Sequence, residues 1–121
     1  MKVIVFVQIE PKDETGAMPS DALLAAMAAY NDELVKAGVM LDLGGLKPTS
    51  ECSRVAFQGG RTSVVDGPFT ESKEIVAGYW VWEVGSYEEA VEWARRCPSD
   101  PDDATTSWLE LRPCVSLEEF A

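Results

Sequence analysis

The hydrophobic pattern of the chain begins with a stretch typical of a buried β-strand. Between residues 3 and 9, apolar side chains occupy both sets of alternating positions, which indicates a strand covered on both faces and central in its sheet. Over residues 23–34 the apolar spacing changes to three and four, which predicts an amphipathic helix with Ser20 as N-cap and Gly38 just beyond its end. A strand is predicted again over residues 39–43, before two glycines that indicate a bulge or a close backbone approach.

The middle of the chain is predicted to form a β-hairpin. Residues 54–58 and 61–65 are extended runs, and only Gly59 and Gly60 separate them. Two adjacent glycines favour a two-residue turn, because both central residues of such a turn adopt positive φ. The segment Asp66-Gly67-Pro68-Phe69 follows with residues typical of a turn, so the hairpin is expected to end there.

The last third of the chain repeats the strand, helix and strand order. Residues 76–84 are strongly strand-like, and residues 86–89 have the S-x-x-E spacing of a capping box that opens a helix. Pro98 closes this helix, a solvated loop is predicted over residues 99–106, and a final strand over residues 108–112.

The element order is therefore β-α-β, a hairpin, and a second β-α-β. This order predicts an α+β, ferredoxin-like split βαβ fold with an inserted β-hairpin, in which both helices cover one face of a largely antiparallel sheet. The opposite face carries too many aromatic and aliphatic residues to lie in water, and a second copy of the chain is the simplest cover. We therefore expect a homodimer.

The composition limits the kinds of function. The chain has 121 residues, 46% of them hydrophobic, which suits one folded domain spanning residues 1–121. Its net charge of −11 repels nucleic acid and anionic membranes. The sequence contains no His, which excludes His bases, His zinc ligands and nucleophiles activated by His. We find no phosphate loop, dinucleotide fingerprint or metal-ligand motif, and expect neither a cofactor nor a metal.

The cysteines and the N-terminal residues indicate in which cellular compartment the protein is expected. Cys52, Cys97 and Cys114 are odd in number and widely spaced, which fits neither a disulfide framework nor a zinc ribbon. Free thiols suggest a reducing compartment. The first residues lack the apolar core of a signal peptide, and no stretch approaches the length of a membrane span. We expect a cytoplasmic protein that does not contact membranes.

Five sequence segments carry a resemblance to a known family. They are NDELVKAGVML (residues 31–41), GLKPTS (45–50), GGRTSVVDGPFTESKE (59–74), GYWVWEV (78–84) and EEAVEWARRCP (88–98). Together with the first strand and the segment LELRP, they cover nearly the whole chain in the same order. The chain thus resembles the YCII-related proteins, and within them the subgroup named for its DGPF motif.

This resemblance implies a dimeric α+β barrel, in which two ferredoxin-like protomers pack sheet against sheet. The broader family includes a dehydrochlorinase, for which a His-Asp pair has been proposed as the active site, and some members are encoded beside extracytoplasmic-function sigma factors. The chain departs from its relatives at two positions, with Gly44 where many carry Glu and Lys47 where some carry His. Without His, the family's dyad does not form here.

Asp66 and Lys47 are the first candidates for a functional site. A carboxylate held by a Gly-Pro turn at the mouth of a barrel suits a general base or a ligand-binding group, and the alternative is an Asx-type bond that stabilises its own turn. Lys47 precedes Pro48 after a strand, where its cation suits an anionic ligand. The alternative for Lys47 is an ordinary surface lysine.

The other ligand-binding candidates lie on predicted strands. Glu83 and Arg112, together with Glu110, alternate so as to point into the dimer interior, where an Arg-carboxylate pair binds a small acid or links the two sheets. Tyr79 belongs to a set of aromatic residues that either line an apolar pocket or fill the core and the interface. The other members of that set are Trp80, Trp82 and Trp108.

These observations leave three functions open. The one we favour is a non-catalytic or regulatory homodimer that binds a small-molecule ligand. The second is a small cofactor-free lyase or isomerase, in which Asp66 moves a proton and Lys47 or Arg112 stabilises the developing anion. The third is a protein-interaction module, which the resemblance links to transcription regulation. A ligand-sized cavity would separate the first two from the third, and Asp66 inside it would favour the second.

Overall fold

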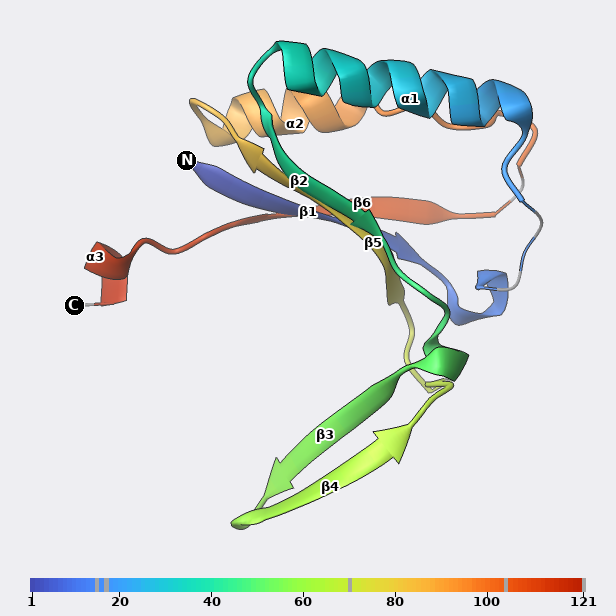
Figure 1. Cartoon of the computed structure of the whole chain (residues 1–121), viewed down its shortest axis with the longest axis vertical. Helices are drawn as coiled ribbons and strands as arrows, with labels where there is room; N and C mark the ends of the chain where they lie inside the picture. The colour runs from blue at the N-terminus through green and yellow to red at the C-terminus, as the bar shows by residue number, and fades with distance from the viewer. Residues whose placement is uncertain (15, 17, 70, 104, 121) are drawn as a thin grey trace.

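The sheet at the centre of the molecule has four antiparallel strands. The computed structural model describes residues 1–14, 16, 18–69, 71–103 and 105–120 and has the strand order β2-β5-β1-β6 (Figure 1). These strands are β1 (Lys2–Ile9), β2 (Met40–Gly45), β5 (Ile75–Glu83) and β6 (Ser107–Pro113). The central place of β1, predicted from its two apolar faces, is confirmed. So is the α+β, ferredoxin-like fold, because this order is that of a split βαβ unit.

Both long helices lie on the same face of the sheet, as the element order predicted. They are α1 (Asp21–Lys36) and α2 (Tyr87–Arg95), and both cross above the sheet (Figure 1). The Oγ atoms of Ser20 and Ser86 each accept a hydrogen bond from the N–H three residues later, at 3.1 and 3.2 Å. Beyond the end of α1, Gly38 has a φ of 72°, in the left-handed region that favours glycine. The predicted caps and stop are therefore present.

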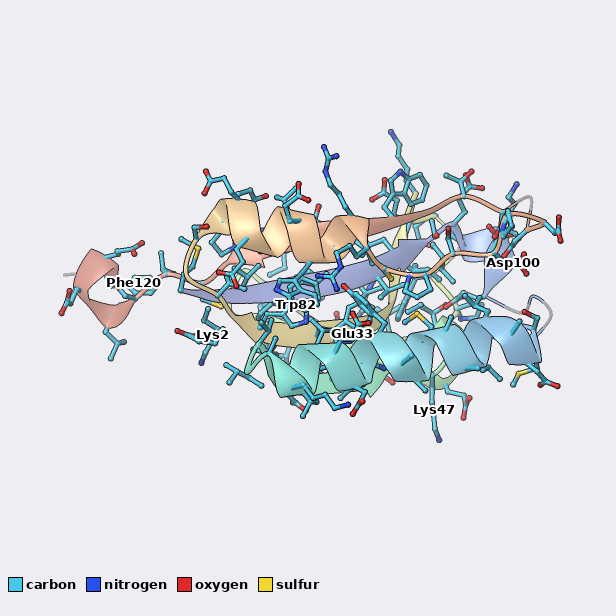
Figure 2. The ribbon with its side chains drawn as sticks, turned by 90° about the horizontal axis from the view of Figure 1, so that it is seen from above. Lys2, Glu33, Lys47, Trp82, Asp100 and Phe120 are labelled. Carbon is cyan, nitrogen blue, oxygen red and sulfur yellow. The ribbon has the colours of Figure 1, made fainter. Side chains whose placement is uncertain are left out.

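The hydrophobic core lies between the helices and the sheet, with Trp82 at its centre (Figure 2). The Trp80 ring meets Tyr30 of α1 edge-on at a centroid distance of 6.0 Å, and its Nε1–H donates to Oδ1 of Asn31 at 2.9 Å. The Tyr30 hydroxyl donates to the carbonyl of Trp93 at 2.6 Å and so joins the two helices. The buried residues of this core are Val3, Val5, Tyr30, Leu34, Val39, Trp80, Trp82, Val84 and Ala90.

The face of the sheet without helices is here called the open face. The strand register places Ile4 of β1 between Val81 and Arg112, and places Phe6 between Tyr79 and Glu110. Its other members include Glu83 and Trp108. The aromatic set of the sheet is therefore divided, because Trp80 and Trp82 lie in the core whereas Tyr79 and Trp108 lie on the open face.

The inserted hairpin extends away from the body of the molecule (Figure 1). It consists of β3 (Ser53–Gln58) and β4 (Arg61–Asp66). Gly59 and Gly60 have φ values of 57° and 77°, so the predicted two-residue turn with positive φ is confirmed. Every residue of the two strands is exposed, and Phe57 is 78% exposed.

Three short helices were not predicted from the sequence. They are η1 (Pro11–Asp13), η2 (Thr49–Glu51) and α3 (Leu117–Phe120). A helix of one turn is too short to show apolar periodicity, so the hydrophobic pattern does not reveal it. At η2 a distant residue supplies the support, because the Glu14 carboxylate accepts hydrogen bonds from the N–H and the Oγ1 of Thr49 at 2.8 and 2.7 Å.

Candidate functional site

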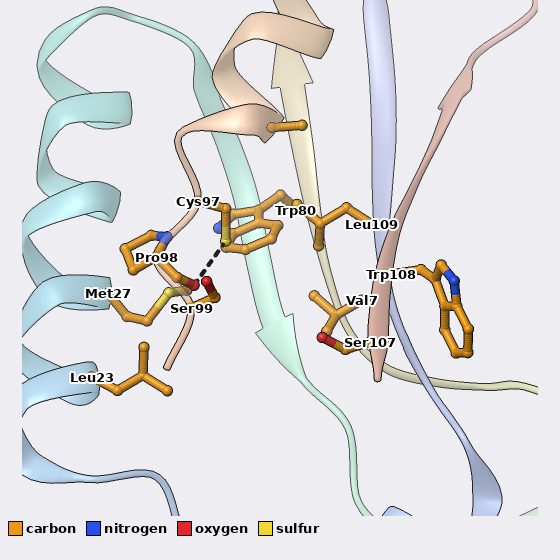
Figure 3. Close-up of a pocket in the computed structure, with 11 residues that line it drawn as sticks. Val7, Leu23, Met27, Trp80, Cys97, Pro98, Ser99, Ser107, Trp108 and Leu109 are labelled. Atoms are coloured by element: carbon orange, nitrogen blue, oxygen red, sulfur yellow. Dashed lines mark hydrogen bonds between the residues drawn. The ribbon is translucent and has the colours of Figure 1, made fainter. Parts of the chain in front are cut away.

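A cavity of about 350 Å³ lies between α1, the segment that follows α2, and the helix-covered face of the sheet (Figure 3). We call it the inner cavity. Its walls come from three parts of the chain, namely Leu23 and Met27 on α1, residues 97–99 after α2, and Val7, Trp80 and Leu109 on the sheet. Because these parts are far apart in sequence, the cavity exists only in the folded chain.

Local sequence patterns orient the side chains of each wall. Leu23 and Met27 are four residues apart on α1, so they share one face of the helix. Val7 and Leu109 are cross-strand neighbours, so their side chains lie side by side on the sheet. The ring of the neighbouring Trp108 points away from the cavity (Figure 3), because alternate residues of a strand face opposite sides.

Cys97 carries the only ionisable side chain among the described residues that line the inner cavity. Its Sγ lies 3.7 Å from the carbonyl oxygen of Pro98. Burial raises the pKa of this thiol, since a thiolate loses its hydration inside the protein. The thiol is therefore neutral at physiological pH, which makes it a weak nucleophile and an apolar part of the wall.

The inner cavity suits the apolar part of a small molecule. Its volume lies within the range of small-ligand pockets, which is about 300–1,000 Å³. The flexible side chain of Met27 adapts to irregular shapes, and the indole of Trp80 offers an aromatic surface. The wall also includes Ser99 and Ser107, whose side chains carry polar hydroxyl groups.

The structure places Asp66 and Lys47 near the base of the hairpin, and neither lines the inner cavity. Asp66 is exposed at the end of β4, and its Oδ1 accepts a hydrogen bond from the Oγ of Ser53 at 2.9 Å. The Lys47 side chain is 79% exposed, and its Nζ lies 3.7 Å from a carboxylate oxygen of Glu51. Both charged groups thus have polar partners in contact with solvent.

Glu83 and Arg112 lie on the open face, on β5 and β6. The Nη1 atom of Arg112 lies 3.6 Å from a carboxylate oxygen of Glu110, which is the Arg-carboxylate pair considered from the sequence. Glu83 is bound elsewhere, because its Oε1 accepts a hydrogen bond from the N-terminal amine of Met1 at 3.1 Å. The two candidates are therefore held in separate exposed ion pairs.

Tyr79 also lies on the open face, where it covers the glycine pair of β2. Its hydroxyl donates to Oδ2 of Asp42 at 3.4 Å. A Cβ atom placed on Gly44 would lie only 2.6 Å from Cε1 of Tyr79, so of the two alternatives predicted at these glycines, a bulge or a close approach, Gly44 shows the close approach. A larger residue at position 44 would displace this ring.

The five candidates from the sequence are thus divided between the hairpin base and the open face, and none of them lines the inner cavity. The residues that do line it gave a different signal in the sequence. Met27 lies within the apolar stripe predicted over residues 23–34, and Cys97 directly precedes Pro98, which was expected to close the second helix. A cavity between three segments leaves no local pattern, so sequence reasoning assigned both residues to the core.

Among the described residues, no three Cys, Asp or Glu side chains lie close enough together to hold one metal ion. In the same part of the chain, each helix is too short or too polar to cross a lipid bilayer.

Comparison with known proteins identifies the family. The sequence model of the YCII-related domain matches residues 1–107. The chain belongs to the YCII-related domain family. It is 31% identical over 93 residues to an uncharacterized protein of Rhizobium meliloti (strain 1021), and the matched region covers 77% of this chain and 73% of that protein. The family inferred from the sequence motifs is confirmed.

Proposed function

We propose that this YCII-related protein is a non-catalytic module that binds a small molecule in the inner cavity. The observation that carries the proposal is the cavity itself, about 350 Å³ of space with mostly apolar walls on α1, the sheet and the segment after α2. Moving an apolar group from water to such a wall is favourable by about 25 cal/mol for each Å² that is buried.

The chemistry of the described residues supports binding over catalysis. The chain has no His, and the one ionisable group found in the cavity wall, Cys97, keeps its proton at physiological pH. Asp66, the base of the alternative lyase or isomerase mechanism, lies outside the cavity and is bound to Ser53. A general base must lie within hydrogen-bonding distance of the proton that it removes.

The proposal includes a homodimer that forms through the open face. Ile4, Phe6 and Val81 are only partly buried at the centre of that face, and Trp108 is 39% exposed beside them. A second copy of the chain would cover these apolar groups, and a two-fold axis would present the same patch from both sides. Assembly of this kind is the dimeric barrel implied by the resemblance to the DGPF subgroup.

We also propose that the protein is located in the cytoplasm. The support for this location is that Cys52, Cys97 and Cys114 are all free in the structure, as is usual for proteins of reducing compartments.

Protection of Cys97 from alkylation tests the proposed function. In a Cys52→Ser, Cys114→Ser background, Cys97 is the only thiol, and its rate of reaction with a maleimide is measured with and without phenylbutanol as the probe. We expect the alcohol to slow the reaction at least about fivefold when it fills the cavity, because the probe then covers the sulfur. Calorimetric titration of the same protein with phenylbutanol measures the affinity directly.

Two variants of α1 provide the control for this experiment. Met27→Trp places an indole in the inner cavity and should abolish both the protection and the calorimetric signal, whereas Ala25→Trp adds the same group at an exposed position and should preserve both. Equal alkylation rates with and without the alcohol, together with no heat of binding, would show that the cavity does not take up apolar molecules.

A further inference from the structure

A second hollow adjoins the inner cavity and extends it toward solvent. Its volume is about 590 Å³, and we call it the outer basin. Val7, Leu23 and Ser107 line both hollows, so the two share a wall where they meet. A molecule that occupies the inner cavity can therefore extend into the outer basin.

The outer basin differs from the inner cavity in its charge. Four carboxylates line it, those of Asp13, Asp100, Asp102 and Asp103, and its described lining includes neither Lys nor Arg. The last three belong to the loop that the sequence identified only as solvated, which the structure places beside the beginning of α1 (Figure 2).

Backbone hydrogen bonds hold two of these carboxylates in place. Oδ1 of Asp100 accepts from the N–H of Asp102 at 2.9 Å, and Oδ1 of Asp103 accepts from the N–H of Thr105 at 2.8 Å. The bond from Thr105 lowers the pKa of Asp103, because a hydrogen-bond donor stabilises the ionised form. Asp103 is therefore negatively charged throughout the physiological pH range.

Some acidic residues elsewhere in the protein have cationic partners. Asp32 lies 2.9 Å from Lys36, and Glu33 lies 2.7 Å from Arg96. Within the described part of the chain, no ion pair involves any of the four carboxylates of the outer basin. Their charges therefore add to the field of a protein whose net charge is −11.

We propose that the inner cavity and the outer basin form one site for an organic cation, an amine whose apolar tail fills the cavity while its ammonium group lies in the basin. This inference rests on the proposed function, since it requires that the inner cavity bind a ligand. The apolar wall selects the tail, and the carboxylates select the charge of the head, because they attract an ammonium and repel a carboxylate.

A metal ion is a poorer occupant of the basin than an ammonium group. Among the residues that the structure describes, no three acidic side chains are arranged to coordinate one ion. An ammonium needs no fixed coordination shell and is attracted by several carboxylates at a distance. The apolar wall that continues into the inner cavity likewise fits an amine with a hydrocarbon tail.

Three probes that share one tail test the charge preference. Phenylbutylamine, phenylbutanol and phenylbutyrate carry a positive, a neutral and a negative head at neutral pH, and calorimetric titration compares their dissociation constants. We expect the amine to bind at least about tenfold more tightly than the alcohol, which corresponds to about 1.4 kcal/mol. We expect the acid to bind most weakly. The preference for the amine should decrease at high salt, because Asp102 and Asp103 of the basin are exposed to solvent.

Two triple variants that remove the same amount of charge test whether the preference for the amine comes from the basin. One changes the loop of the basin, and the other is a control. The loop variant carries the three substitutions Asp100→Asn, Asp102→Asn and Asp103→Asn. In this variant the dissociation constants of the amine and the alcohol should differ by no more than about threefold. Glu88→Gln, Glu92→Gln, Glu118→Gln removes the same charge from exposed positions outside both hollows and should leave the preference unchanged. Maleimide protection of Cys97 provides a second readout for each protein and probe.

The outcomes separate this inference from the proposed function. Binding of the alcohol with no advantage for the amine would overturn the cation site and leave the inner cavity as a binding site. If the control variant loses the amine preference as strongly as the loop variant does, the preference comes from the overall charge of the protein. That result would also overturn the cation site. Failure of all three probes to bind would contradict the proposed function itself.

Discussion

The two faces of the central sheet are made from alternate residues of the same strands, yet their side chains differ in burial and in the partners of their polar groups. On the helix-covered face, Trp80 and Trp82 are 4% and 0% exposed, and the Nε1–H of Trp80 donates to Asn31 inside the protein. On the open face, the charged groups of Glu110 and Arg112 pair in contact with solvent. One face is thus closed within a protomer, and the other is not.

Because of this difference, we expect substitutions on the helix-covered face to affect folding stability and substitutions on the open face to affect association. Residues of the helix-covered face are packed against two helices, so shortening them leaves a cavity that the fold does not refill. Residues of the open face have lost less contact with water, so changing them affects mainly what the protomer associates with. The helix-covered face also contains the inner cavity, at the end where α1 and the segment after α2 leave the sheet incompletely covered (Figure 3).

Trp82→Ala is expected to have the largest effect on folding. The indole is fully buried among the helices and the sheet, and removing such a group costs about 3–5 kcal/mol of the free energy of unfolding. Urea denaturation measures the loss. Val81→Ala, on the open face of the same strand, should cost less than half as much, and equal losses at the two positions would contradict the contrast between the faces.

Trp82→Phe refines the same test. Among the described residues, the buried Nε1–H of Trp82 has no hydrogen-bond partner, so replacing the indole removes no hydrogen bond. Trp80→Phe does break one, to Asn31, and should be the more destabilising of the two changes to phenylalanine.

Trp108→Asp is expected to act on assembly. In the proposed homodimer the new carboxylate would be buried between two sheets without a partner, which is strongly unfavourable. We expect the dissociation constant of the dimer to rise at least about 100-fold, or about 2.7 kcal/mol, while the protomer remains folded. Light scattering over a range of concentrations measures the change. Phe120→Asp, at an exposed position on α3, is the control and should remain dimeric. An unmodified protein that is monomeric at micromolar concentration would refute the dimer.

Tyr30→Phe should have a smaller effect that depends on pH. The change removes a hydrogen bond to the carbonyl of Trp93 and should cost about 1 kcal/mol near neutral pH. Burial raises the pKa of Tyr30 above its ordinary value, so folding favours the neutral hydroxyl. That contribution is complete below about pH 10, the pKa in the unfolded chain, and is lost as the pH rises above it.

Unfolding curves above and below pH 10 test this dependence. Tyr30→Phe should be less sensitive to alkaline pH than the unmodified protein, whereas Tyr87→Phe, at an exposed position, should not differ from it. The same alkaline loss of stability in all three proteins would mean that Tyr30 is not responsible for it.

Local rules were sufficient for most elements of the fold. The N-caps at Ser20 and Ser86, the stop at Gly38 and the turn at Gly59 and Gly60 all depend on residues within a few positions of one another, so the sequence alone determined them. The period-two rule for strands also accounts for the division of β5, with Trp80 and Trp82 in the core and Tyr79 on the open face, because alternate side chains of a strand must face opposite sides. The element order then favoured the split βαβ arrangement of the four strands, which the structure has.

Only the tertiary structure decided where a ligand-sized space remains. Met27 and Cys97 resemble ordinary core residues in the sequence, and they line a cavity because α1, the segment after α2 and the sheet leave a space between them. Likewise, no local pattern links Glu14 to Thr49, although their hydrogen bonds support η2. The reason is physical. Hydrogen bonds at caps and turns join neighbours in the sequence, whereas the volume between packed elements depends on side chains contributed by distant parts of the chain.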